Sequence, residues 1–397
     1  MTVRTVRFPS LFLLGLTGAL ALASSQGLGR FFYTPVLPGM MASLGLSPAD
    51  AGLIAAANFA GYLIGALLAA QSWAAGRERS AALAGLLATA VLMALMAWPQ
   101  SLAPFIAIRF LAGLASAFAL IFTSAIVLEL AARAGSATVP SAMFGGVGLG
   151  ISLSSLIVMA VYVLAGGSGE SWRPGWLTGS LLALAIFALA AVVLPKPQAG
   201  ARKATEPELK WRPLFVIVAA AYCCFGFGYI VSATFLVAIA RQAGSGQWVE
   251  FSAWFATGIA CFASLFAWQP LVRRRGADVV FAICMVLLAA GTLASVLLPA
   301  RFAVVAGGIL LGCTFMVITS CGLATGRTFA PESPRRAMGV MTAIFGVGQI
   351  AGPLVGGWAA DISGSFLLPS VIAAGILMIG AALLVPVITA RRQTAGR

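Results

Sequence analysis

Apolar residues occur along this chain in long runs, separated by short segments that carry glycine, proline and charged residues. A helix needs about 20 apolar residues to cross the roughly 30 Å hydrocarbon core of a bilayer, and the runs are close to that length or longer. The pattern therefore predicts twelve membrane-spanning helices. Their approximate bounds are 10–38, 49–73, 80–98, 104–130, 138–164, 175–194, 213–240, 249–272, 278–298, 302–326, 337–359 and 366–388.

The composition agrees with a membrane protein and argues against other classes. Hydrophobic residues make up 61% of the 397 positions and charged residues only 9%, against about 25% charged residues in soluble domains. This excludes a soluble enzyme, a disordered protein and a disulfide scaffold. It also disfavours a β-barrel, whose strands alternate around a polar lumen. The bilayer is therefore expected to be the main solvent of the chain.

The basic residues set the expected orientation. The net charge is +14, yet no basic patch alternates with exposed aromatic residues, so we expect no nucleic-acid partner. The loops on the side of both chain ends carry nineteen Lys and Arg residues, and the other side carries three. By the positive-inside rule, both termini are cytoplasmic and the protein lies in the inner membrane. The nineteen are Arg4, Arg7, Arg77, Arg79, Arg133, Lys196, Arg202, Lys203, Lys210, Arg212, Arg273, Arg274, Arg275, Arg327, Arg335, Arg336, Arg391, Arg392 and Arg397.

The two halves of the chain resemble each other at an almost constant offset. Gly27-Leu28-Gly29-Arg30 matches Gly226-Phe227-Gly228-Tyr229, Gly113 matches Gly312, and Gly146-Val147-Gly148 matches Gly346-Val347-Gly348. We expect a six-helix bundle over 1–195, a cytoplasmic linker over 196–212 and a second bundle over 213–397. Parallel repeats of this kind place a substrate near the membrane midplane, between halves that rock to expose it alternately. Tight packing in any helix bundle is the alternative explanation of the glycines.

Three segments resemble the major facilitator superfamily. Residues 27–38 are similar to its YbfB/YjiJ-type subfamily, Arg109-Phe110-Leu111-Ala112-Gly113 resembles the Arg motif of its fourth helix, and the loop Gly76-Arg77-Glu78-Arg79 resembles its Gly-and-Arg loop without the usual Asp. The resemblance implies an all-α membrane protein with twelve transmembrane helices in two pseudo-symmetric bundles. It further implies a coupling or packing role for Arg109 and a gating role for Arg77 and Arg79. The alternative for Arg109 is that its side chain extends to the outer interface. We expect the transporter to be a monomer.

Arg30 is the charge inside a span that most needs an explanation. An Arg at the centre of a membrane helix costs about 2.5–3.5 kcal/mol, which requires a cavity, a partner or a ligand. Gln26, Arg30 and Tyr33 are spaced i, i+4, i+7 and would share one helix face. This spacing predicts a polar wall of a substrate cavity. The alternative is that Arg30 extends to the outer interface, with Tyr33 in the aromatic belt.

No carboxylate lies in the middle of any span, because all ten acidic residues fall at span ends or in loops. The cavity would therefore be positive or neutral, which points to a small anionic substrate held bidentately by Arg30. Asn58, Tyr62, Tyr229 and Gln349 are further candidates from their polarity and repeat positions, although each could instead bond between helices. The predicted substrate-binding residues are Gln26, Arg30, Tyr33, Asn58, Tyr62, Tyr229 and Gln349.

The expected function is secondary active transport of a small organic anion by alternating access. The alternative is an exporter of amphiphilic or drug-like compounds. A membrane enzyme is not expected, because the chain has no His, no Asp-x-Asp and no Cys-x-x-Cys motif that could form a catalytic or metal site. We expect no cofactor, no metal and no use of ATP, since no Walker-type glycine loop occurs.

Overall fold

The computed structural model describes residues 10–136, 138–167, 169–195 and 206–395. Within these ranges the chain forms helices, twelve of which are long and apolar enough to cross a membrane. The first span combines α1 (Leu11–Leu22), η1 (Ala23–Leu28) and α2 (Tyr33–Leu44). The others are α3 (Pro48–Ala69), α4 (Glu78–Leu95), α5 (Leu102–Arg133), α6 (Thr138–Leu164), α7 (Trp172–Val193), α8 (Pro213–Gln242), α9 (Gln247–Ala267), α11 (Ala277–Leu297), α12 (Ala300–Thr328), α13 (Pro334–Ser363) and α14 (Leu367–Ala395).

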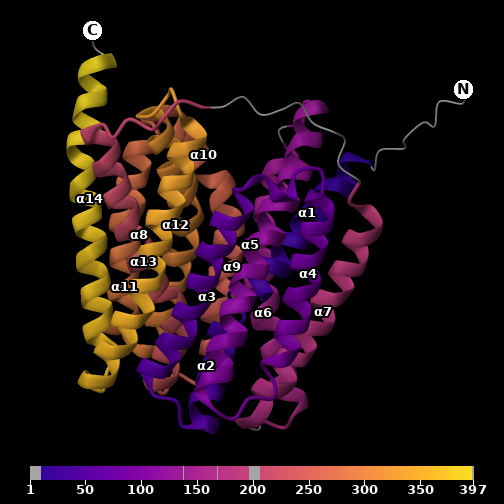
Figure 1. The fold of residues 1–397 in the computed structure, drawn as a ribbon. Coiled ribbons are helices and arrows are strands. Elements are labelled where there is room, and N and C mark those ends of the chain that lie inside the picture. The colour runs from indigo at the N-terminus through magenta and orange to yellow at the C-terminus, as the bar shows by residue number, and fades with distance from the viewer. Residues whose placement is uncertain (1–9, 137, 168, 196–205, 396–397) are drawn as a thin grey trace, which may run out of the picture.

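The spans form two bundles that stand side by side, α1 to α7 in one and α8 to α14 in the other (Figure 1). Helix α1 begins and α14 ends at the same end of the molecule, at the top of Figure 1. The expected fold of twelve helices in two six-helix bundles is therefore confirmed. The helix ends differ from the expected bounds by several residues, because apolar patterning marks the membrane core and not the polar turns beyond it.

Equivalent glycines create equivalent contacts in the two bundles. A Cβ added to Gly113 of α5 would overlap the carbonyl oxygen of Asn58 in α3. A Cβ added to Gly312 of α12 would overlap the carbonyl oxygen of Thr257 in α9. Both glycines therefore allow two helix backbones to meet, and both partners lie at the same offset of the repeat. Packing of bare backbones is how membrane helices associate without a hydrophobic driving force.

The first span is broken near its middle, where a continuous helix was expected. The π-helix η1 ends at Leu28, and a turn separates it from α2. Close packing on α6 accompanies this break, because a Cβ at Gly27 would overlap the backbone of Gly150. A π-turn also rotates all later residues about the helix axis relative to an α-helix, and π-turns occur often at functional sites.

The eighth span is also shorter than expected. Helix α9 ends at Ala267, and the remaining residues form a separate short helix, α10 (Gln269–Arg275). Pro270 stands in the first turn of α10, where the missing amide hydrogen is tolerated but a continuous α9 would be interrupted. The exposed side chains of Arg273, Arg274 and Arg275 consequently belong to the loop region and not to the span.

We call the end at which α1 begins and α14 ends the basic end. Successive spans alternate in direction, so the described basic loops gather there, including the three arginines of α10 (Figure 1). Arg391 pairs with Asp278 at 2.9 Å and Arg212 with Glu332 at 2.5 Å, both within the second bundle. The predicted basic residues Arg4, Arg7, Lys196, Arg202, Lys203 and Arg397 lie outside the described residues, as does part of the predicted linker.

The two bundles contact each other mainly along three helix pairs, α2 with α8, α3 with α13, and α6 with α9, and α2 also touches α9. Their polar contacts lie in the half of the molecule away from the basic end or near its middle. Thr34 Oγ1 donates to Ala233 O at 2.6 Å, Ser155 Oγ to Phe251 O at 2.9 Å, and Ser152 Oγ to Phe255 O at 3.0 Å. The bundles are therefore closed against each other over that half.

Candidate functional site

Arg30 lies close to the middle of the 34-residue first span. Its side chain is buried, with 6% of its surface exposed. Arg30 Nη1 donates to Gln26 Oε1 at 3.1 Å, and Gln26 is itself held by a bond from Nε2 to Ser116 O of α5 at 3.1 Å. The guanidinium therefore lies inside the protein, at a position fixed by a second polar side chain.

Aromatic rings surround the guanidinium. Its Cζ lies 4.0 Å from the ring centroid of Tyr62, 5.0 Å from that of Phe59 and 5.8 Å from that of Phe31. Rings at such distances attract a cation through their quadrupole, and the attraction is stronger away from water. These contacts offset part of the cost of burying Arg30.

One edge of the guanidinium has no partner. Nε and Nη2 of Arg30 are buried and make no hydrogen bond to the described residues. These two nitrogens point their N–H groups in the same direction and form the fork that binds a carboxylate side-on. Gln26 occupies the other edge. The free donors are therefore the pair best suited to a planar anionic group.

No acidic side chain competes for this fork. The ion pairs among the described residues join Glu129, Glu170, Glu206, Glu250, Asp278 and Glu332 to arginines or a lysine near the helix ends. Asp50 caps α3 by accepting from the Ser47 amide at 3.0 Å. The charge of Arg30 is thus not neutralised by a carboxylate of the described chain.

Tyr229 and Gln349 face this site from the second bundle. Gln349 Nε2 on α13 donates to the hydroxyl of Tyr229 on α8. Tyr229 holds the position equivalent to Arg30 in the repeat, and its ring stacks on Phe315, which contacts Phe31 next to Arg30. Gln349 is fully buried, and its Oε1 has no hydrogen-bond partner among the described residues. Each bundle thus brings one polar pair to the same level of the interface.

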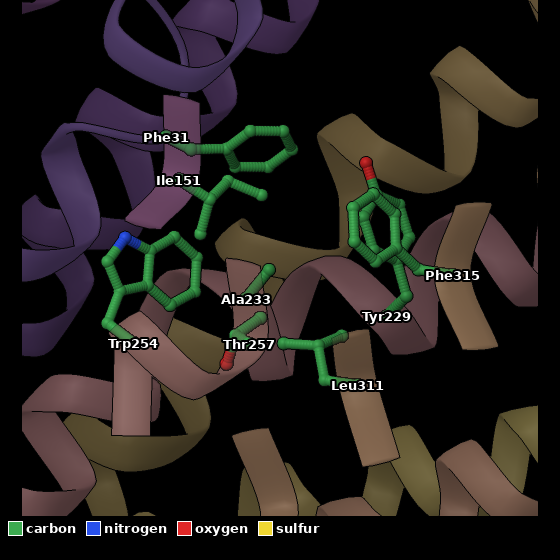
Figure 2. Close-up of a pocket in the computed structure, with 8 residues that line it drawn as sticks. All are labelled: Phe31, Ile151, Tyr229, Ala233, Trp254, Thr257, Leu311 and Phe315. Atoms are coloured by element: carbon green, nitrogen blue, oxygen red, sulfur yellow. The ribbon is translucent and has the colours of Figure 1, made fainter. Parts of the chain in front are cut away.

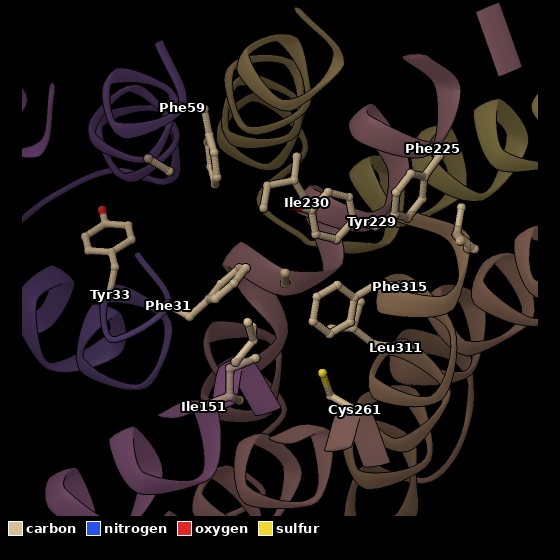
Figure 3. Packing of buried hydrophobic residues seen from close by; sticks show 14 of the residues in the cluster. Phe31, Tyr33, Phe59, Ile151, Phe225, Tyr229, Ile230, Cys261, Leu311 and Phe315 are labelled. Atoms are coloured by element: carbon tan, nitrogen blue, oxygen red, sulfur yellow. The ribbon is translucent and has the colours of Figure 1, made fainter. Parts of the chain in front are cut away.

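An aromatic cluster extends from Tyr229 (Figure 3). The ring of Tyr229 is nearly parallel to those of Phe315 and Phe345, at interplanar angles of 4° and 9°. Phe31 of the first bundle approaches Phe315 at 6.2 Å and Trp254 at 6.3 Å between centroids. No sequence signal marks Phe31, Trp254, Phe315 or Phe345, because phenylalanine is frequent throughout the chain and only the fold brings these rings together.

The rings leave little space between them. A small cavity with room for no more than about one water molecule lies between the bundles (Figure 2). The interface is therefore occluded at this level in the present conformation. The cavity is lined by Phe31, Ile151, Tyr229, Ala233, Trp254, Thr257, Leu311 and Phe315.

Tyr33 does not share the face of Gln26 and Arg30, which corrects the expected polar wall. Its hydroxyl donates to Ala51 O at 3.1 Å, and its ring centroid lies 5.2 Å from Cζ of Arg109. The wall was expected for a regular α-helix, whereas η1 and the following turn separate Arg30 from Tyr33. Asn58 likewise makes a contact between helices, since its Nδ2 donates to Arg109 O at 2.9 Å.

Arg109 holds the break in the first span. It is 2% exposed, and its Nη1 and Nη2 donate to Gly29 O at 2.9 Å and Arg30 O at 3.0 Å. A turn that leaves the α-helix frees carbonyl groups that need donors when buried. Arg109 supplies those donors, so it fixes the backbone from which Arg30 extends.

Arg77 and Arg79 lie at the basic end, at the start of α4, and not at the level of this site. Arg79 donates to Leu194 O at 2.7 Å and to Ala191 O at 2.5 Å. These are the last carbonyls of α7, so Arg79 caps a helix of its own bundle. Arg77 is exposed. Among the described contacts, none joins either arginine to the second bundle, and their gating role stays a prediction.

The chain matches a known family over most of its length. The profile described as "Uncharacterised MFS-type transporter YbfB" covers residues 22–385. The protein belongs to this family of major facilitator superfamily transporters. The superfamily expected from residues 27–38 and from the Arg109 motif is thereby confirmed. The family and the fold are those of transporters and not of enzymes.

Individual relatives are more distant. A chloramphenicol resistance protein of Streptomyces lividans is 28% identical over 353 residues, covering 83% of this chain and 85% of that protein. A point mutant of the nucleoside transporter NupG aligns with a TM-score of 0.75 at 15% identity, covering 94% of this chain and 98% of NupG. The human organic anion transporter MFSD10 aligns with a TM-score of 0.65 at 15% identity, covering 95% and 100%. At these identities the two structures establish the fold alone.

Proposed function

We propose that this YbfB-type transporter is a secondary active carrier of a small organic anion. The observation that carries the proposal is the free side-on fork of Arg30, which is buried beside Phe31 at the bundle interface and has no carboxylate partner among the described residues. A carboxylate or phosphate group fits that fork with two parallel, charge-assisted hydrogen bonds. Arg30 binds the anion, Gln26 orients the guanidinium, and Tyr229 and Gln349 contact the substrate from the second bundle.

Alternating access follows from the position of the site. A substrate held between two pseudo-symmetric bundles is exposed to either side when one bundle rocks against the other. The present closure over the half away from the basic end is one position of that movement. By the positive-inside rule we propose that the basic end, rich in Arg, is cytoplasmic, with both termini in the cytoplasm and the protein in the inner membrane. We further propose that it acts as a monomer.

Uptake into proteoliposomes tests the anion site. Purified protein would be offered radiolabelled benzoate, succinate and glycerol 3-phosphate, and the variants Arg30→Gln and Arg30→Lys would be compared with the wild type. We expect Arg30→Gln to abolish uptake of the transported anion, and Arg30→Lys to retain a small part of it, because lysine keeps the charge but not the planar fork.

Arg274→Gln is the matched control, since it removes the same charge from an exposed position of α10. Its uptake should equal that of the wild type. Size-exclusion profiles of all variants report on folding. Full uptake of every tested anion by a correctly folded Arg30→Gln protein would refute the anion site.

Export of an uncharged, drug-like compound is the second candidate function. Two observations favour it: the relative named as a chloramphenicol resistance protein, and the aromatic cluster around Tyr229. Chloramphenicol resistance can be read directly by expressing the protein in a sensitive bacterial host. If the protein exports such compounds, the inhibitory concentration of chloramphenicol rises several-fold, and the rise depends on the aromatic residues more than on Arg30.

A further inference from the structure

We infer that the substrate of the Arg30 site is an aromatic anion, a flat ring that carries one carboxylate or a similar planar acidic group. This inference rests on the proposed anion transport and narrows it. The charge requirement comes from the free Nε and Nη2 of Arg30. The ring requirement comes from the surfaces that surround this fork on both bundles.

The first bundle already holds Arg30 against aromatic faces. Tyr62, Phe59 and Phe31 lie between 4.0 and 5.8 Å from its Cζ. An anionic headgroup that reaches the fork therefore enters a space bounded by rings, and the body of the ligand attached to it must contact them. An aliphatic or hydroxylated body would leave the ring faces without matched partners, and hydroxyl groups would be buried with few acceptors.

The second bundle presents aromatic surface to Phe31, which borders Arg30. Phe315, Tyr229 and Phe345 stand nearly parallel to one another. Across the interface, Phe31 makes an edge contact with Phe315 and a tilted contact with Trp254. Figure 3 shows Phe31 of the first bundle pointing toward Phe315 and Tyr229 of the second. In the occluded form these rings pack against one another and fill the space between the bundles. When the bundles separate, a substrate ring can replace these contacts with its own edge and face.

The polar groups in this space are few, which limits the substrate further. Besides Arg30 and Gln26, the described side chains at this level contribute the hydroxyl of Tyr62, beside Arg30, and the paired Tyr229 hydroxyl and Gln349 amide. The small cavity beside them is lined by apolar and aromatic residues and Thr257, whose hydroxyl already donates to Ala253 O at 2.8 Å. The site can therefore satisfy one anionic group and a few further hydrogen bonds, from Tyr62, Tyr229 and Gln349.

Ligand binding to the full-length protein separates charge from aromaticity. The probes are benzoate and 2-naphthoate, their saturated-ring counterparts cyclohexanecarboxylate and decahydro-2-naphthoate, and the neutral benzamide. Affinity is measured by titration calorimetry on purified protein in nanodiscs. We expect the aromatic acids to bind about two- to ten-fold more tightly than the saturated acids, as ring pairs contribute beyond their buried area. Benzamide should bind far more weakly than benzoate.

Phe315→Leu tests which residue supplies the preference. This variant should lose the preference for aromatic over saturated acids while it still binds both through Arg30. Phe366→Leu is the matched control, because Phe366 pairs with Phe235 at 5.2 Å near the end of α8, away from Arg30. It should keep the wild-type preference.

The outcomes distinguish the two proposals. Equal binding of aromatic and saturated acids, with loss of both in Arg30→Gln, would overturn the aromatic inference and leave the anion carrier standing. Equal binding of benzamide and benzoate would overturn the charge requirement and with it both proposals. Both proposals would also fail if the acids bound equally well to Arg30→Gln, or if no acid bound to the wild-type protein. A preference that survives in Phe315→Leu would overturn the assignment of the ring site.

Discussion

At the scale of single residues, the Arg30 site is unusual in how its charge is stabilised. A buried arginine commonly has a carboxylate partner, because an isolated buried charge costs several kcal/mol. Here Gln26 contributes no charge, and the closest compensation is the face of Tyr62 at 4.0 Å from Cζ. A permanent carboxylate partner would block the fork and repel an anionic substrate. Aromatic faces stabilise the cation and leave the fork free.

Tyr62→Leu therefore has a defined consequence. It removes the nearest ring face from Arg30, and we expect the protein to lose about 1–2 kcal/mol of stability, the range for a cation–π contact shielded from water. Tyr62→Phe keeps the ring and removes only the hydroxyl that also interacts with Arg30, so it should lose less stability than Tyr62→Leu. Thermal unfolding of the two purified variants, followed by tryptophan fluorescence, is the measurement. If both variants unfold at the same temperature, the ring face does not stabilise Arg30.

At the scale of helices, apolar patterning predicts where spans occur but not where they break. The twelve apolar runs correspond to twelve helices, because the length and hydropathy of a run are enough to predict a membrane span. The break after η1 has no such signature, since Gly27 and Gly29 also suit simple packing. It depends on the contact of Gly27 with Gly150 and on the donors of Arg109, which only the assembled bundle provides.

The same limit determines which residues of the candidate site could be predicted from the sequence. Arg30, Gln26 and Tyr62 can be proposed from the sequence because polar side chains are rare in the spans, so each one is conspicuous. The face expected for Tyr33 is wrong because it presupposes a regular helix across the break. The rings of Phe315 and Phe345 escape prediction because aromatic residues in a membrane helix are ordinary, and only their stacking around Tyr229 marks them.

Mutagenesis can test whether the glycine contacts within each bundle stabilise the packing of its helices. In Gly113→Ala, the added methyl group overlaps the carbonyl oxygen of Asn58, so α3 and α5 must separate. We expect a loss of about 1–3 kcal/mol, the usual cost of overpacking. Gly375→Ala in α14 is the control, because its added Cβ has no neighbour within 4 Å. The yield and melting temperature of the purified proteins should fall for the first variant only, and equal values would contradict the packing role.

At the scale of the whole molecule, the contacts between the two bundles are of a kind that can break when the bundles move apart. The contact of Thr34 with Ala233 joins α2 and α8 through a single bond from side chain to backbone. Close approach of α6 and α9 relies on glycine, since a Cβ at Gly148 would lie 2.6 Å from the carbonyl oxygen of Gly258. No described ion pair crosses between the bundles. Such an interface can open without separating buried charges.

A cross-link between Thr34 and Ala233 should therefore stop transport. In a background whose six native cysteines are replaced by alanine, Thr34→Cys with Ala233→Cys would be bridged by a short bifunctional thiol reagent and assayed for uptake into proteoliposomes. The control pair is Ser180→Cys with Ala90→Cys, since Ser180 Oγ also donates to a buried alanine carbonyl, Ala90 O at 2.7 Å, but within the first bundle. If the bundles rock as rigid units, only the first bridge halts uptake, whereas continued uptake across a complete Thr34–Ala233 bridge would mean that this half of the interface need not open.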